Sequence, residues 1–391
     1  CGGGDFLNMT TIHPSDFLPP APNVKYARAA KESGLLKIPV ATIGALQDLD
    51  LMEEILATGG ADIIAGARSY ISNPDFAKHV YEETPEDIRP CIKCYSCLTG
   101  FVKTGLWSCA VNPTLGREHQ LSGWDSASPK KKHVAIVGGG PAGMQAAITA
   151  ADQGHDVVLF EKESFLGGKI NSFDHEFFKS STKKFKEYLI CQVKKRPITI
   201  HLETEATPQD ILAGGFDVVI PAVGAAHTVP SIPGIKEHSV LFADEVFEKE
   251  QSIGQNVVII GGGLSGCELA CELGRQGKTV AVLEQRNRLA MDANNTYVID
   301  VYHTMSELGT IQIPNAVCQC IEENGVIYYV GSTEKKLEAD TVIIACGMRA
   351  KTSEANRFYK SAKYCRPIGD CVTARNIMYA IREGYDAAKC I

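Results

Sequence analysis

Two glycine-rich turns, residues 138–143 (GGGPAG) and 261–266 (GGGLSG), constrain the fold of this chain more than any other feature. Each turn follows a short apolar run and precedes a helical pattern, a second apolar run and a glutamate. The glutamates, Glu161 and Glu284, fall at the same distance after the first glycine of each turn. This strand, turn, helix and strand order is typical of dinucleotide-binding units. The chain is therefore α/β and contains such a unit twice.

In the first copy we expect strands over 133–137 and 156–160 and a helix over 144–153. Gly138 allows the tight turn, Gly140 lets the backbone approach a pyrophosphate, and Gly143 lets helix and strand pack closely. The start of the helix supplies N–H donors for the phosphates. Glu161 is placed to hold a ribose hydroxyl pair.

In the second copy we expect strands over 257–260 and 279–283, with a helix that ends near Gln276. A carboxylate at Glu284 accepts from a free ribose 2′-hydroxyl and repels a 2′-phosphate, which favours NADH. Arg286 and Arg288 follow closely and keep NADPH possible, because they suit either phosphate recognition or a solvated basic loop.

Four cysteines stand where the periodic pattern stops: Cys91, Cys94, Cys97 and Cys109. Three thiolates within one short irregular segment can bind one corner of a [4Fe–4S] cluster, and the later cysteine can complete it. Structural zinc is the alternative, although such sites usually take their thiolates as two CxxC pairs. We favour the cluster. We expect Cys267 with Cys271, on one helix face, and Cys318 with Cys320, on one strand face, to fill the core.

Composition excludes several classes of function. The net charge is −7 and basic residues are scattered, so nucleic acid is not an expected partner. No apolar run is long enough to cross a bilayer, and no leader pattern begins the chain, so we expect no membrane contact and a cytoplasmic protein. Fourteen cysteines then point to metal or redox chemistry more than to disulfides. The chain starts at Cys1, which we interpret as a fragment without its N-terminus.

The N-terminal residues show the rhythm of βα units, with strands expected over 5–9, 38–43 and 61–65 and a helix over 49–58. A complete (β/α)8 barrel needs about 200 residues, so this segment predicts only the C-terminal end of one. Residues 118–132 have no apolar period and are expected to form a linker.

From the first turn onward, the motif order resembles flavoprotein reductases of glutathione-reductase type. In that family the first turn binds FAD, the second binds NAD(P)H, and a late Gly-Asp, here Gly369-Asp370, reaches the flavin's ribityl chain. One departure is Pro221-Ala222-Val223-Gly224, where the family usually has Ala-Thr-Gly. Residues 165–178 carry no cysteine pair, which disfavours disulfide reduction.

The cysteine segment, between a barrel's end and a GGGPAG turn, resembles the iron–sulfur flavoenzymes of the old yellow enzyme superfamily, over the C-terminal portion of such proteins. That group includes NADH:flavin oxidoreductases, 2,4-dienoyl-CoA and enoate reductases, and trimethylamine dehydrogenase. The resemblance implies FMN in the barrel, with its phosphate at the ends of the last two strands. In this chain those ends carry Gly44, Ala45, Ala67 and Arg68.

The resemblance implies that NADH reduces FAD, that electrons pass singly through the cluster to FMN, and that FMN reduces an activated C=C bond. The small-molecule substrate would be an enoyl thioester or an enoate. One alternative runs the path backwards from an amine, with ADP at the first site. Another is an electron-transfer (diaphorase) fragment without substrate turnover. His13 follows the first expected strand, and we weigh it as a catalytic proton donor against a structural histidine. A homo-oligomer is possible.

The expected domain order is 1–85 (barrel end), 86–132 (cluster segment and linker), 133–247 (FAD domain, first part), 248–350 (NAD(P)H domain) and 351–391 (FAD domain, second part). The expected FAD residues are Gly138, Gly140, Pro141, Ala142, Gly143, Glu161, Lys162, Gly168, Lys169, Ala222, Gly224, Gly369 and Asp370. The expected NADH residues are Gly261, Gly263, Leu264, Ser265, Gly266, Glu284 and Gly347.

Overall fold

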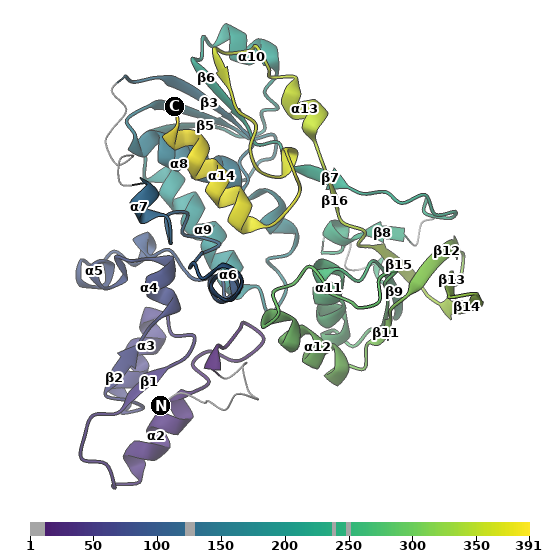
Figure 1. Cartoon of the computed structure of the whole chain (residues 1–391), viewed down its shortest axis with the longest axis horizontal. Helices are drawn as coiled ribbons and strands as arrows, with labels where there is room; N and C mark the ends of the chain where they lie inside the picture. Colours follow the sequence, from purple (N-terminus) through teal and green to yellow (C-terminus); the bar gives the residue numbers. More distant parts are fainter. Residues whose placement is uncertain (1–11, 122–129, 237–239, 248–251) are drawn as a thin grey trace. The chain divides into compact units, whose positions relative to one another are not determined.

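A computed structural model describes residues 12–121, 130–236, 240–247 and 252–391 (Figure 1). The chain forms two compact units. Unit 1 contains residues 1–171, 178–225 and 350–391, and unit 2 contains residues 172–177 and 226–349. The second unit is therefore inserted into the first along the chain. The strand expected over 5–9 lies outside the described residues.

The centre of unit 1 is a five-stranded parallel sheet in the order β17-β6-β3-β4-β5. Its strands are β3 (His133–Val137), β4 (Asp156–Phe160), β5 (Ile198–His201), β6 (Val218–Pro221) and β17 (Tyr364–Cys365). The first two match their predicted bounds. Strand β3 is almost wholly buried because both faces of a parallel sheet are covered.

Helices of unit 1 cover this sheet and are labelled in Figure 1. They are α8 (Pro141–Asp152), α9 (Ser180–Lys194), α10 (Pro208–Ala213), α13 (Thr352–Asn356) and α14 (Ile377–Lys389). Alanines fill much of the inner face of α8, so α14 can lie directly against it. A Cβ at Gly384 would stand 2.4 Å from the carbonyl oxygen of Ala142, so glycine is required at this crossing.

The N-terminal part of unit 1 is a short βαβ arrangement. Strands β1 (Ala41–Ile43) and β2 (Ile63–Ala65) pair in parallel, with α3 (Leu49–Ala57) between them in the chain. Asp48 caps α3 by accepting the Leu51 N–H at 3.2 Å. The remaining helices are α2 (Val24–Glu32), α4 (Arg68–Ser72), α5 (Phe76–Tyr81), α6 (Ser96–Thr104) and α7 (Glu118–Leu121). That this part is the C-terminal end of a (β/α)8 barrel stays a prediction.

Unit 2 has its own five-stranded parallel sheet in the order β11-β10-β9-β15-β8. Its strands are β8 (Val240–Phe242), β9 (Asn256–Ile260), β10 (Thr279–Leu283), β11 (Ile311–Ile313) and β15 (Thr341–Ile344), with helices α11 (Leu264–Arg275) and α12 (Tyr297–Glu307). An antiparallel sheet follows, made of β12 (Ala316–Glu322), β13 (Gly325–Val330) and β14 (Thr333–Glu338). Strands β7 (Ala225–His227) and β16 (Met348–Ala350) form a separate pair.

Two sequence predictions need correction. The linker expected over 118–132 begins with a helical turn, α7, whose Leu121 is buried, and residues 122–129 lie outside the described residues. The prediction that Cys318 and Cys320 share one strand face and fill the core is wrong. The pairing register of β12 shifts between them, and both are only half-buried. The predicted domain boundaries remain predictions. None of the described helices is long and apolar enough to span a membrane.

Candidate functional site

The first glycine turn connects β3 to α8. Gly138 has φ 112°, and a Cβ there would lie 2.4 Å from the carbonyl oxygen of Ala222. At Gly143 a Cβ would lie 1.9 Å from the carbonyl oxygen of Gly138, so only glycine lets the helix approach the turn. Gly140 differs, because an added Cβ would meet only the Gly168 Cα, at 3.8 Å. The turn is therefore open at the start of α8, where N–H groups can donate hydrogen bonds to a pyrophosphate.

A buried glutamate and the returning C-terminal segment complete this turn. Glu161 accepts the N–H of Gly139 at 2.7 Å through Oε2 and the N–H of Glu163 at 2.9 Å through Oε1. A Cβ at Gly369 would lie 2.9 Å from the Ala142 Cβ, which brings the Gly-Asp motif back to the first turn. Burial raises the pKa of Asp370, and its carboxylate accepts the Arg375 N–H at 3.0 Å.

The second glycine turn, between β9 and α11 in unit 2, repeats these contacts. Gly261 has φ 109°, and a Cβ there would lie 2.4 Å from the carbonyl oxygen of Ala345. At Gly266 a Cβ would lie 2.1 Å from the carbonyl oxygen of Gly261. Glu284 accepts the N–H of Gly262 at 2.8 Å and that of Arg286 at 2.8 Å. The two turns are therefore structural copies, including the position of the acid.

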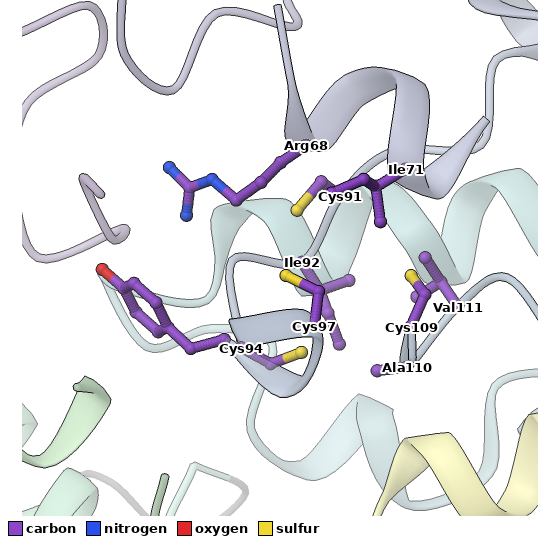
Figure 2. Close-up of a pocket in the computed structure, with 10 residues that line it drawn as sticks. Arg68, Ile71, Cys91, Ile92, Cys94, Cys97, Cys109, Ala110 and Val111 are labelled. Carbon is purple, nitrogen blue, oxygen red and sulfur yellow. The ribbon is translucent and has the colours of Figure 1, made fainter. Parts of the chain in front are cut away.

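The four predicted cluster cysteines meet in one pocket of unit 1 (Figure 2). Figure 2 shows their sulfur atoms facing a common space. The remaining lining comes from Arg68, Ile71, Ile92, Tyr95, Ala110 and Val111. Cys91 and Cys94 precede α6 and Cys97 lies in its first turn, whereas Cys109 follows the helix. Lys93 and Tyr95 have φ 50° and 58°, so this loop holds two non-glycine residues in left-handed conformations.

The chemistry of this pocket suits a polynuclear metal group. Burial raises the pKa of Cys91 to about 12, and that of Cys109 to about 11. Several thiolates at one buried place are therefore unfavourable without a compensating cation. Among the described residues no three Cys, His, Asp or Glu side chains converge on a point suited to one metal ion. The four sulfur atoms face a common space (Figure 2), and four thiolates around one space are the usual ligand set of a [4Fe–4S] cluster.

Contacts that the sequence did not predict hold the cysteine segment in place. Gln47 donates to the Cys91 carbonyl oxygen at 3.0 Å and accepts the Cys91 N–H at 2.8 Å. Lys93 forms an ion pair with Asp16, and both side chains are buried, with 11% and 5% of their surface exposed. Asp16 also accepts the Ser181 N–H and hydroxyl, each at 2.9 Å. These partners come from segments far apart in the chain, so no local pattern marks them.

The predicted FMN-phosphate residues lie at the C-terminal ends of two adjacent parallel strands. Gly44 and Ala45 follow β1, with φ 134° and 53°, and Ala67 and Arg68 follow β2. Arg68 donates to the Pro14 carbonyl oxygen at 2.6 Å and lies over the Tyr95 ring at 5.6 Å. Its Nη1 is buried and has no hydrogen-bond partner among the described residues. An oxyanion at this place would satisfy that donor.

His13 lies near the same arginine. Its pKa is lowered, first by burial and then by the positive charge of Arg68. The carbonyl oxygen of His13 accepts a hydrogen bond from the Tyr95 hydroxyl, which ties this segment to the cysteine pocket. The catalytic role of the ring stays a prediction.

Three further cysteines, Cys267, Cys271 and Cys371, have structural surroundings. Cys267 and Cys271 are fully buried on α11, as predicted. Cys371 is buried behind the Gly-Asp motif, and its sulfur lies 3.0 Å from the carbonyl oxygen of Ile368.

Residues 132–377 match the family model of pyridine nucleotide-disulphide oxidoreductases. The chain belongs to this family. An NADH oxidase of Thermoanaerobacter brockii is 34% identical over 363 residues, which cover 90% of this chain and 56% of that protein. A cinnamate reductase of Clostridium sporogenes is 31% identical over 366 residues, or 91% of this chain and 54% of that protein. This chain thus spans about half the length of these relatives.

Structural comparison agrees with the sequence. The chain superposes on 2-naphthoyl-CoA reductase, from its complex with 2-naphthoyl-CoA, with a TM-score of 0.92 and 30% identity over 96% of this chain and 57% of the other. These relatives confirm the predicted resemblance to flavoenzymes of the old yellow enzyme superfamily, over their C-terminal part. The chain has the Rossmann-type α/β fold of the FAD and NAD(P)H domains of this family.

Proposed function

We propose that this chain is the electron-delivering part of an NAD(P)H-dependent enzyme that reduces an activated C=C bond. FAD would bind at the first glycine turn, the nicotinamide coenzyme at the second, and a [4Fe–4S] cluster on Cys91, Cys94, Cys97 and Cys109. The observation that carries this proposal is the pocket shared by the four cysteine side chains, within the unit that holds the first glycine turn. Bound there, a flavin accepts hydride and a cluster passes electrons singly.

The spacing of the four cysteines supports a cluster over zinc. Cys91, Cys94 and Cys97 lie within one short segment and Cys109 follows later in the chain, whereas structural zinc sites usually take their thiolates as two CxxC pairs. Apolar side chains, including Ile71, Ile92 and Val111, line the remaining walls and limit access of water to the sulfurs. Limited solvent access is one of the properties that sets the potential of a cluster.

Arg68, which also lines the cysteine pocket, supports the binding of an FMN phosphate. Its Nη1 is a buried donor without a partner, and it lies at the end of β2 beside the backbone of Ala67. The carboxyl ends of barrel strands are where flavin and substrate phosphates bind in barrel enzymes. The residues around Arg68 therefore fit the phosphate of FMN, and the role of the chain's barrel segment would be to hold it.

The substrate class rests on the relatives. Cinnamate reductase and 2-naphthoyl-CoA reductase are names of enzymes that act on conjugated carboxylic acids or their CoA thioesters. We infer that the substrate here is an enoate or an enoyl thioester.

Anaerobic purification with metal and sulfide analysis tests the cluster. We expect iron and acid-labile sulfide in equal amounts, and we expect both to be lost in Cys94→Ala but kept in Cys390→Ala, whose side chain is exposed. Zinc in place of iron would contradict the proposal. A second assay follows NADH-dependent reduction of an artificial dye, which requires both glycine turns.

The same preparation separates the alternative functions. Release of FAD on denaturation fits the proposal, whereas release of ADP indicates amine oxidation in the reverse direction. Dye reduction without any reduction of cinnamate or a cinnamoyl thioester by the chain alone indicates a diaphorase fragment.

A further inference from the structure

The loop that follows the second strand folds back on its glycine turn in both units. In unit 1 the N–H of Gly167 donates to the Gly139 carbonyl oxygen at 3.0 Å. In unit 2 the N–H of Ala290 donates to the Gly262 carbonyl oxygen at 2.7 Å. The residue before each donor is a buried leucine, Leu166 in unit 1 and Leu289 in unit 2. The same offset in numbering relates all of these pairs, so the two loops correspond residue by residue.

The two loops carry opposite charges at one equivalent position. Two residues after the donor, unit 1 has Lys169 and unit 2 has Asp292, and both are exposed. In unit 2 the Asp292 Oδ1 accepts the N–H of Leu264, the first residue of α11, at 2.9 Å. Both carboxylate oxygens lie 3.7 Å from the position of a Cβ on Gly263. At the equivalent Gly140 of unit 1, only the Cα of Gly168 comes within 4 Å.

The Asp292 carboxylate therefore lies where the second dinucleotide needs to place its own anion. The N-terminus of a helix after a glycine turn binds pyrophosphate through its free N–H groups and its dipole. Here one of those N–H groups already has an anionic partner. A pyrophosphate and a carboxylate at the same place repel each other, so the coenzyme must displace the side chain. Because Asp292 is exposed, it can rotate into solvent when this happens.

We propose that Asp292 competes with the pyrophosphate of the nicotinamide coenzyme and so sets its affinity. The inference rests on the proposed function only in taking the second turn as the coenzyme site. The open first turn, with Lys169 at the equivalent position, retains its flavin. The second turn, with Asp292, exchanges its ligand. A reductase must keep its flavin bound and exchange its nicotinamide coenzyme in every cycle. Two dinucleotide-binding units with the same fold must therefore differ in affinity.

Coenzyme binding to Asp292→Asn tests the proposal. Asparagine keeps the shape, and its side-chain oxygen can still accept the Leu264 N–H, so the substitution removes only the charge. Isothermal titration calorimetry measures coenzyme binding to the flavin-loaded chain. The ligand is NAD⁺ if NADH supports dye reduction and NADP⁺ if NADPH does. We expect the dissociation constant to fall about three- to tenfold in low salt, from helix-dipole and charge effects of the usual size. The gain shrinks in high salt because the Asp292 side chain is exposed to solvent.

Three further variants sharpen the test. Asp292→Lys, which copies the first turn, is expected to bind coenzyme more tightly than Asp292→Asn. Lys169→Asp is expected to release FAD more readily. Glu307→Gln removes an exposed charge of α12 that pairs with His303, and it is expected to leave both affinities unchanged.

An unchanged or raised dissociation constant in Asp292→Asn, with an unchanged melting temperature, overturns the inference. Wild-type chain that binds neither coenzyme contradicts the proposed function instead. The two failures are therefore distinguishable.

Discussion

The side-chain amide of Gln47 forms two hydrogen bonds with the backbone of Cys91, one to its carbonyl oxygen at 3.0 Å and one from its N–H at 2.8 Å. Gln47 precedes α3 in the N-terminal βαβ arrangement, and Cys91 opens the cysteine loop. One side chain thus fixes the distance between two segments far apart in the sequence. It also fixes the backbone of a residue whose sulfur faces the proposed cluster.

We predict that Gln47→Leu loosens this loop. Leucine leaves the N–H and the carbonyl group of Cys91 without partners, which costs about 1–3 kcal/mol for a buried group. Iron content after a chelator challenge is expected to fall relative to wild type, together with the melting temperature. Gln209→Leu changes an exposed glutamine of α10 and serves as the matched control. Equal iron retention in both variants would refute the role of Gln47.

From the buried ion pair between Lys93 and Asp16 we predict that the effects of changing each partner on stability are not additive in a double-mutant cycle. Lys93→Met leaves the Asp16 carboxylate buried without its cation, and breaking a buried pair in this way costs about 3–5 kcal/mol. Replacing both partners, as Lys93→Met with Asp16→Leu, removes the buried charge. Because Asp16 also accepts from Ser181, the double variant recovers only part of the loss. Thermal unfolding measures the cycle, and additive effects of the two changes would contradict it.

The buried thiol of Cys267 is expected to make the free energy of unfolding depend on pH. Burial raises the pKa of its thiol from 9.0 to about 12. Between these two values the unfolded chain loses a proton that the folded chain keeps, so this residue makes the fold less stable as pH rises above about 9. Cys267→Ala is expected to flatten the decline of unfolding free energy between about pH 9 and 10.5 in urea titrations. Cys390→Ala, at an exposed site, is expected to leave the slope unchanged.

We expect Glu284 to determine the preference for NADH over NADPH. Its carboxylate holds the N–H groups of Gly262 and Arg286, at the end of β10 where a ribose 2′-hydroxyl would bind. Glu284→Gln keeps one acceptor but loses the charge that repels a 2′-phosphate. The ratio of kcat/KM for NADPH to that for NADH is expected to rise about tenfold in dye reduction, a difference of roughly 1.4 kcal/mol. Glu161→Gln is the equivalent change at the flavin turn and is expected to weaken FAD retention without altering this ratio.

The sequence by itself determined where the two glycine turns lie and which four cysteines come together. Gly138, Gly143, Gly261 and Gly266 lie within contiguous strand, turn and helix segments whose geometry is local, so a motif reports it directly. Cys91, Cys94 and Cys97 are likewise close in sequence. The bounds of β3, β4 and β10 followed from apolar runs, because strands covered on both faces admit few polar residues.

Only the tertiary structure decided what surrounds these motifs. Gln47 and Asp16 reach the cysteine loop across long stretches of chain, and a single sequence carries no signal for such hydrogen bonds. Asp292 looks like an ordinary loop residue until the fold brings its carboxylate to the first N–H of α11. The helical turn at 118–121 and the register shift in β12 also arise from packing and strand pairing, not from local pattern. Motifs encode backbone shape locally, whereas the charges and hydrogen bonds that tune them depend on contacts between distant residues.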